Sequence, residues 1–167
     1  TLSDAPVAHI VRRSCEIKAQ VVSEDEREAD RRRILNFGHT IGHALESLGG
    51  YRGLIHGEAV AVGMVYEADL ARHLGYCEQG VVTRLRALLA AAGLPVTLPN
   101  VPFGALWEAM QQDKKVSAGT VYCVLPERIG SVRIVPLAKE ATRDWYETVR
   151  TRDTGSRHRA RGKTLTR

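Results

Sequence analysis

Two histidines, His39 and His43, stand four residues apart in the segment RRILNFGHTIGH, and a third, His56, follows thirteen residues after the second. In a helix, residues four apart lie on the same face, and Arg32 and Asn36 would continue that row at three- and four-residue steps. A row of imidazole, amide and guanidinium groups is suited to binding a metal ion or an anionic substrate. We therefore treat this segment as a candidate site.

The spacing of the histidines allows three interpretations. In the first, His39 and His43 share one zinc ion, and a histidine of the next helix completes a catalytic site with an open position. In the second, both rings lie where two helices pack closely beside small residues, and backbone carbonyls satisfy their nitrogens. The third is a metalloprotease, which requires a glutamate directly after the first histidine, and Thr40 excludes it.

The composition indicates a protein of a reducing compartment. Cys15, Cys77 and Cys123 are widely separated, and we find no recognisable signal peptide or long apolar run. We therefore expect a cytoplasmic localisation without membrane association. The cysteines are expected to be small packing or near-surface residues.

The positive charge is concentrated at one end of the chain. The formal net charge is +5, and six of the 24 Lys and Arg residues but only one of the 19 acidic residues lie in 151–167. We predict a globular metal- and substrate-binding domain over 1–150 and a basic, disordered tail over 151–167. The tail has no aromatic residue to stack on a base, so we do not expect nucleic-acid binding.

Apolar periodicity and helix-ending residues predict a mainly α fold, a multi-helix domain with one β-hairpin. Helices are expected at about 6–23, 31–48, 56–75, 79–92, 102–112 and 138–150. Two alternating runs, 120–125 and 131–137, are separated by PERIG and predict the hairpin. The glycines at 38, 42, 57 and 63 each cost about 1 kcal/mol against alanine in a helix, which indicates close backbone packing around the histidines.

Several motifs, in the same order and at similar spacing, resemble the 3-dehydroquinate synthase family. They are KAQVV at 18–22, DERE at 25–28, NFGHTIGHALE at 36–46, IHGEAVAVGM at 55–64, AGLP at 92–95 and DKK at 113–115. The resemblance covers about residues 5–150. Several motifs in the same order identify a family more specifically than any single motif does. The resemblance implies the fold of the C-terminal domain of that family.

The resemblance also implies an activity. The reaction would convert 3-deoxy-D-arabino-heptulosonate 7-phosphate to 3-dehydroquinate and phosphate in the shikimate pathway, with NAD and zinc or cobalt as cofactors. Family members bind NAD through an N-terminal domain with a glycine-rich loop, and this sequence contains no such motif. We therefore expect the C-terminal half of a larger enzyme, inactive by itself. Family members are commonly homodimers, and the sequence leaves open which oligomer this protein forms.

In the family, two histidines of this domain and a glutamate of the N-terminal domain hold the metal, and the resemblance assigns the two histidines to His39 and His56. His43 would instead lie beside the substrate phosphate and assist its elimination. Glu58 is expected to support the first turn of the helix that follows His56. The spacing argument alone would have made His43 the second ligand.

The resemblance implies five further contacts to the substrate. Lys18 and Arg32 would bind its carboxylate and neighbouring hydroxyls, which suits a cation and a planar guanidinium. Asn36 and Lys114 would lie near the phosphate, and Glu28 would hold the polar network together. Without the resemblance, these charged side chains would be interpreted as solvent-facing.

Two alternatives remain open from the sequence. One is another sugar-phosphate cyclase or a related metal-dependent alcohol dehydrogenase, although the Lys18 and Arg32 pocket favours a carboxylated substrate. The other is an inactive or regulatory fragment that lacks the nucleotide-binding domain.

Overall fold

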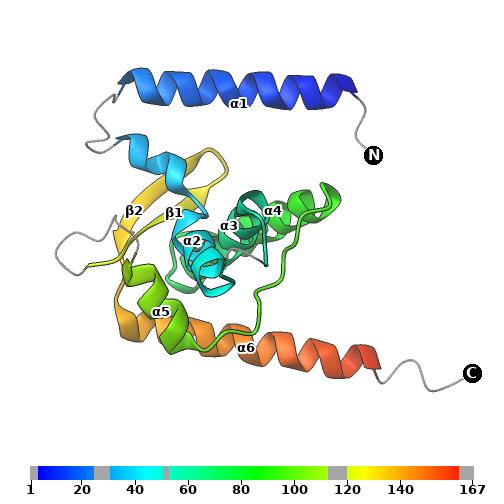
Figure 1. Cartoon of the computed structure of the whole chain (residues 1–167), viewed down its shortest axis with the longest axis vertical. Coiled ribbons are helices and arrows are strands. Elements are labelled where there is room, and N and C mark those ends of the chain that lie inside the picture. Colours follow the sequence, from blue (N-terminus) through cyan, green and yellow to red (C-terminus); the bar gives the residue numbers. More distant parts are fainter. Residues whose placement is uncertain (1–3, 25–30, 51–52, 113–119, 162–167) are drawn as a thin grey trace, which may run out of the picture.

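The computed structural model describes residues 4–24, 31–50, 53–112 and 120–161 of the 167-residue chain. In these ranges it has the mainly α fold with one β-hairpin that the sequence predicted (Figure 1). The helices are α1 (Asp4–Glu24), the short 3-10 helix η1 (Arg31–Asn36), α2 (His39–Leu48), α3 (His56–His73), α4 (Gln79–Ala91), α5 (Phe103–Gln112) and α6 (Lys139–Arg161). The strands are β1 (Tyr122–Arg128) and β2 (Ser131–Pro136).

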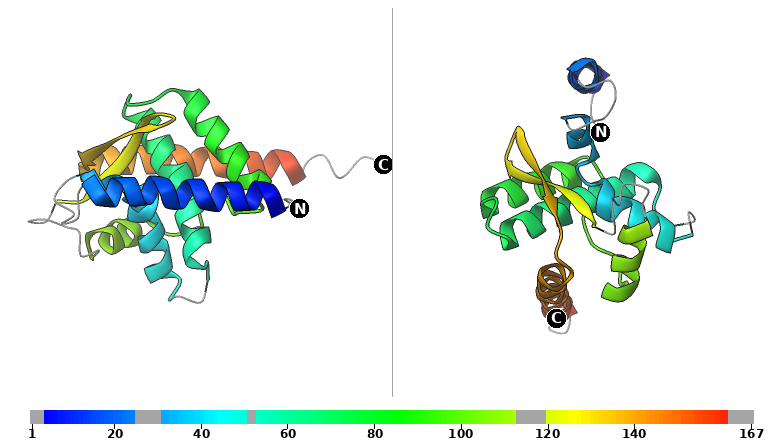
Figure 2. Two further views of the ribbon diagram at one scale, coloured as in Figure 1. Left: turned by 90° about the horizontal axis from the view of Figure 1, so that it is seen from above. Right: turned by 90° about the vertical axis from the view of Figure 1, so that its left-hand side faces the viewer.

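The two longest helices, α1 and α6, lie on opposite sides of the molecule. The right-hand view of Figure 2 shows both end-on, with the other helices and the hairpin between them. Helix α6 closes the core, because Trp145 is fully buried and its ring centroid lies 6.4 Å from that of Tyr66 in α3. Phe103 and Trp107 of α5 are buried in the same cluster. The core therefore lies between α3, α5 and α6.

Helix α1 carries an apolar stripe that the rest of the chain covers only in part. Val21 is buried near its C-terminal end, and with Ile17 it lines an apolar hollow formed with η1, α4 and the hairpin. Val7, Ile10 and Val11 are 42–56% exposed. A stripe at helical spacing predicts a helix correctly but does not by itself say how much of it is buried.

The predicted single helix over 31–48 is wrong, because the chain breaks at Phe37 and Gly38 between η1 and α2. Gly38 has a φ of +84°, which glycine adopts without strain. A Cβ on Gly63 of α3 would stand only 1.9 Å from the carbonyl oxygen of Gly38. The turn therefore lies directly against α3.

The packing role predicted for the glycines is confirmed at three of the four positions. Added Cβ atoms at Gly38, Gly42 and Gly63 would meet backbone atoms of the facing segment at 3.2 Å or less. At Gly57 an added Cβ would meet nothing within 4 Å, so the prediction is wrong there. Gly57 lies in the first turn of α3, outside the close contact between α2 and α3.

The hairpin is confirmed, with a shorter turn than the PERIG loop that was expected. Tyr122 pairs with Pro136, and the antiparallel ladder continues to Arg128 opposite Ser131. A bulge lies between Pro126 and Arg128, which fits a proline that cannot donate to the ladder.

Helix α6 continues past Arg150 to Arg161, into the segment predicted to be a disordered tail. Arg152 Nη2 lies 2.6 Å from Asp69 Oδ2 in α3, and Trp145 Nε1 donates to the same carboxylate at 2.9 Å. Burial acts to raise the pKa of Asp69, but these bonds and the charges of Arg152 and Arg72 outweigh it and lower the pKa. The first part of the predicted tail is thus helical, whereas the division at 150 and the disorder of the tail stay predictions.

We expect Arg152→Ala to lower the free energy of unfolding by about 1–2 kcal/mol, because it removes an ion-pair partner from a buried carboxylate that keeps Arg72 and Trp145. Urea denaturation measures the change. Arg84→Ala, which removes the same charge from an exposed position on α4, is the control and should stay within about 0.5 kcal/mol of wild type. Equal effects of the two substitutions would show that the contact to Asp69 does not stabilise the fold.

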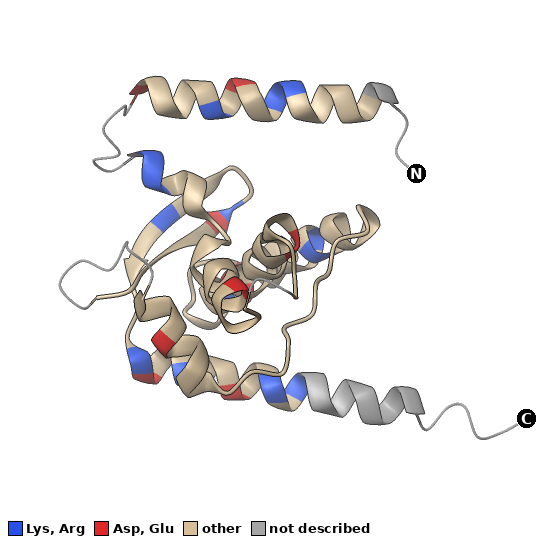
Figure 3. Cartoon of the chain, in the orientation of Figure 1, with Lys and Arg blue, Asp and Glu red and all other residues tan. Residues whose placement is uncertain are grey.

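Basic and acidic residues are interspersed along α1 and along residues 139–152 of α6 (Figure 3). Among the residues that the structure describes, no helix is both long enough and apolar enough to cross a membrane.

Candidate metal and substrate site

Three histidine rings cluster where α2 and α3 begin. His39 is the first residue of α2, His43 follows one turn later, and His56 is the first residue of α3. The ring centroids are 5.2 Å apart for His39 and His43, 5.5 Å for His39 and His56, and 5.8 Å for His43 and His56. His39 and His56 thus converge from different helices, as predicted, while their role as ligands stays a prediction.

The spacing of the rings suits a shared divalent ion. Zinc binds imidazole nitrogen at about 2.0–2.1 Å with tetrahedral geometry, which places the centroids of two ligating rings about 5 Å apart. All three pairs lie near that separation. Ring spacing therefore fits zinc or cobalt, but it does not choose between His43 and His56 as the partner of His39.

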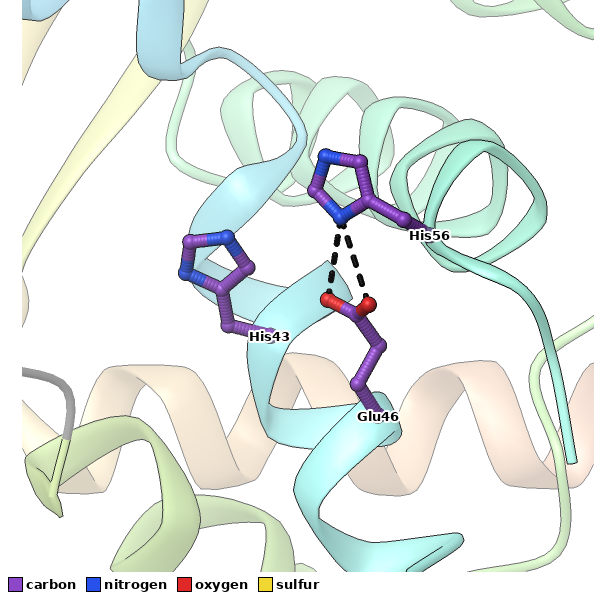
Figure 4. A group of neighbouring side chains, drawn as sticks. All are labelled: His43, Glu46 and His56. Carbon is purple, nitrogen blue, oxygen red and sulfur yellow. Dashed lines mark hydrogen bonds and ion pairs between the residues drawn. The ribbon is translucent and has the colours of Figure 1, made fainter. Parts of the chain in front are cut away.

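Glu46 joins the histidines, although the sequence analysis did not assign it to the site. Figure 4 shows its carboxylate facing the His56 ring, and both oxygens lie 3.2 Å from Nδ1 of His56. Potential ligand atoms of His43, Glu46 and His56 all lie within 4.8 Å of one another. The signal was present in the sequence, because positions 39, 43 and 46 share one face of a helix.

A second carboxylate, that of Glu67 in α3, holds the start of α2 in place. It is fully buried and accepts hydrogen bonds from the N–H groups of Gly38 at 2.5 Å and Ile41 at 3.0 Å. The first N–H groups of a helix have no partner within the helix, so Glu67 acts as a cap from another element. Burial raises the pKa of Glu67 to about 8, against the lowering effect of these backbone bonds.

The sequence analysis also missed Glu67. The available signal was that two acids, Glu67 and Asp69, stand in the otherwise apolar part of the predicted third helix. Because Glu67 holds the turn before His39, it determines where the first turn of α2 presents its histidines.

The first turn of α3 is held by Glu58, as predicted. Its carboxylate accepts a hydrogen bond from the N–H of Ile55 at 3.1 Å. The side chain of His56 is 59% exposed, so the ring lies at the surface on a well-anchored backbone.

The predicted substrate-binding residues lie on separate elements. Arg32 and Asn36 are half-buried on η1, and the break at Gly38 shows that the expected continuous row with His39 is wrong. Lys18 is exposed on α1, with η1 between that helix and α2 (Figure 1). The other two predicted positions, Glu28 and Lys114, lie outside the described residues.

Curated relatives share a high identity with this chain. It is 50% identical over 139 residues to the 3-dehydroquinate synthase of Caldanaerobacter subterraneus subsp. tengcongensis, covering 83% of this chain and 39% of the relative. It is 53% identical over 126 residues to the 3-dehydroquinate synthase of a Synechococcus strain, covering 75% of this chain and 34% of the relative. The chain thus spans less than half the length of the curated relatives it matches.

Two solved structures share the fold. One is ValA, a 2-epi-5-epi-valiolone synthase from Streptomyces hygroscopicus subsp. jinggangensis with NAD+ and Zn2+ bound, at a TM-score of 0.74, 24% identity and coverage of 87% of this chain and 40% of that chain. The other is 2-deoxy-scyllo-inosose synthase complexed with carbaglucose-6-phosphate, NAD+ and Co2+. Its TM-score is 0.73 at 25% identity, and the match covers 90% of this chain and 42% of that chain.

The family model described as 3-dehydroquinate synthase C-terminal matches residues 1–116, which is more than half of the chain. This match and the identity to curated relatives cover the helices that bring the three histidines together. The chain therefore belongs to the 3-dehydroquinate synthase family and corresponds to its C-terminal domain.

Proposed function

We propose that this chain is the metal- and substrate-binding part of a 3-dehydroquinate synthase. The enzyme would be an NAD- and metal-dependent phosphate lyase that converts 3-deoxy-D-arabino-heptulosonate 7-phosphate to 3-dehydroquinate and phosphate. The observation that carries the proposal is the convergence of His39, His43 and His56 in a sequence 50% identical to a protein of that name. The complexes of related cyclases with NAD+ and Zn2+ or Co2+ support the choice of cofactors.

In this proposal His39 and His56 hold the divalent ion, with a third ligand from the nucleotide-binding domain of the whole enzyme. The bound metal would supply Lewis acidity at the substrate hydroxyls, and NAD would supply reversible hydride transfer. The caps from Glu67 and Glu58 hold the backbone at the start of both helices. The two histidines therefore need little rearrangement to bind an ion.

His43 acts on the phosphate rather than on the metal. Its ring lies 5.2 Å from that of His39, so a substrate held beside the ion would contact both side chains. A protonated imidazole can donate to the phosphate oxygen as the carbon–oxygen bond breaks. Asn36 and Lys114 would bind the same phosphate, and Lys18 and Arg32 would bind the carboxylate and neighbouring hydroxyls of the substrate. Glu28 would hold this polar network together.

A chimera tests this proposal. In it, this chain replaces the aligned C-terminal part of the Caldanaerobacter relative, to which it is 50% identical. With NAD and zinc we expect dehydroquinate and phosphate in equal amounts. We expect the 167-residue chain alone to form no dehydroquinate and to bind no NAD measurably.

Histidine substitutions in the chimera separate the two predicted roles. His43→Ala should lower kcat about 100-fold or more and leave the metal content unchanged, because it removes a proton donor. His39→Ala and His56→Ala should lower both activity and metal content. A chimera that folds and binds zinc but makes no dehydroquinate would contradict the proposed activity, and loss of metal from His43→Ala alone would contradict the ligand assignment.

A second candidate function is that of another sugar-phosphate cyclase, which the structural likeness to 2-deoxy-scyllo-inosose synthase favours. A hexose 6-phosphate lacks the carboxylate that Lys18 and Arg32 are proposed to bind. Turnover of that substrate in preference to the carboxylated one would favour the second function.

A further inference from the structure

The hydrogen bond between Glu46 and His56 joins the two helices of the site. A neutral imidazole carries its proton on one nitrogen and can bind a metal through the other, so the partner of one nitrogen decides which nitrogen is available. In this structure the partner of Nδ1 is the Glu46 carboxylate, with both oxygens at 3.2 Å.

Glu46 is the better-held member of this pair. Its side chain is 13% exposed, whereas that of His56 is 59% exposed. It follows the buried Leu45 in α2, and α2 is packed closely against α3 at Gly42. The carboxylate is therefore the fixed group, and the exposed ring takes its orientation from it.

The positions of His39 and Glu46 along α2 indicate which edge of the ring faces the site. They are seven residues apart, which corresponds to about 10 Å along a helix axis. The His56 ring reaches both, since its centroid lies 5.5 Å from that of His39 while its Nδ1 lies 3.2 Å from Glu46. Figure 4 shows Nδ1 of His56 turned to Glu46 and the other ring nitrogen, Nε2, on the side of the ring away from that carboxylate, so Nε2 is the nitrogen available to a metal.

We propose that Glu46 is a positioning residue for His56: its carboxylate keeps the proton on Nδ1 and thereby presents Nε2 to a divalent ion. A neutral histidine in water exchanges between its two tautomers, so the contact pre-organises the ligand before the ion arrives. The statement about the ion rests on the proposed function. The statement about the proton position does not.

The competing arrangement is direct ligation by Glu46. His43, Glu46 and His56 are close enough to bind one ion together, and that ion would lie at Nδ1 of His56, where the hydrogen bond now is. The two arrangements differ in the ring nitrogen that carries the metal, which can be measured.

The first experiment measures the proton position in the metal-free 167-residue chain by 15N-detected NMR of the histidine rings, above about pH 8, where imidazole is neutral. We expect His56 to be the Nδ1–H tautomer. Glu46→Gln keeps the shape but can donate to Nδ1 as well as accept from it, so the preference should be lost. Glu108→Gln is the control, because it removes the same charge from an exposed position on α5, and it should keep the tautomer.

The second experiment measures zinc affinity of the same three proteins by competition with a chromophoric chelator. We expect Glu46→Gln to bind zinc about 10–100-fold more weakly than wild type, as is typical when a partner of a metal-binding histidine is lost. Glu108→Gln should stay within about twofold, and NMR of the zinc-bound wild type should place the metal on Nε2 of His56.

An unchanged tautomer in Glu46→Gln, or zinc bound at Nδ1 of His56, would overturn the role of Glu46 and leave the proposed function standing. If instead the tautomer shifts as expected but the chimera with the wild-type sequence binds no zinc, the positioning role holds and the proposed metal site loses its support.

Discussion

Gly63→Ala is expected to separate α2 from α3 and to lower the free energy of unfolding by about 3 kcal/mol or more. The added methyl group would stand 1.9 Å from the carbonyl oxygen of Gly38 and 2.9 Å from the backbone nitrogen of Gly42. Backbone atoms cannot rotate away as a flexible side chain can, so the helices must move apart. Because these helices carry His39 and His56, zinc affinity should fall together with stability, and urea denaturation with a zinc titration measures both.

Gly57→Ala provides the control in the same helix. An added Cβ there meets nothing within 4 Å, and alanine favours a helix over glycine by up to about 1 kcal/mol. We expect stability equal to or slightly above that of wild type and unchanged zinc affinity. If the two substitutions had the same effect, close packing of α2 on α3 would not be what holds the histidines together.

Glu67→Ala is expected to lower the free energy of unfolding by about 3–5 kcal/mol. The substitution leaves the buried N–H groups of Gly38 and Ile41 without their acceptor, which costs about 1–3 kcal/mol of stability for each group. It also leaves a cavity, which destabilises the fold further. Glu108→Ala, which removes a carboxylate from an exposed position on α5, should stay within about 0.5 kcal/mol of wild type. A small effect at Glu67 would mean that water replaces the carboxylate as the cap of α2.

The stability contributed by Glu67 is expected to depend on pH. Its folded pKa of about 8 lies above the ordinary value of 4.5, so the contribution is fully present below 4.5 and is lost as the pH rises through about 8. Glu67→Gln cannot titrate at this position. The difference in unfolding free energy between wild type and Glu67→Gln should therefore shrink from about pH 5 to about pH 9, and a constant or growing difference would contradict the raised pKa.

Several features of the fold could be predicted from the sequence, because the signals are local. The ends of α3 and α4 follow from apolar periodicity and from glycines just beyond the last turn. The break between η1 and α2 could not be predicted in this way, since residues 31–48 read alone favour one helix. The contact that places the turn, between Gly38 and Gly63, joins two positions far apart in the chain.

The same distinction applies to α6. Composition beyond Arg150 is basic and without apolar periodicity, which is typical of a solvated tail. In the structure Arg152 is held by Asp69 on α3, whose buried carboxylate accepts from both Trp145 and Arg152. The ion pair between Arg152 and Asp69 therefore depends on the packing of α6 against α3, which the composition of the tail does not indicate.

The sequence by itself determined the family of this protein, the helical content and the three histidines, because motif order and residue periodicity are properties of the chain. The tertiary structure alone decided that Glu46 meets His56 and that Glu67 caps α2. Both carboxylates lie within predicted helices, and neither has a local sequence signal that names its partner. Their roles depend on how α2 and α3 cross, and that crossing is set by close backbone contacts at Gly38, Gly42 and Gly63.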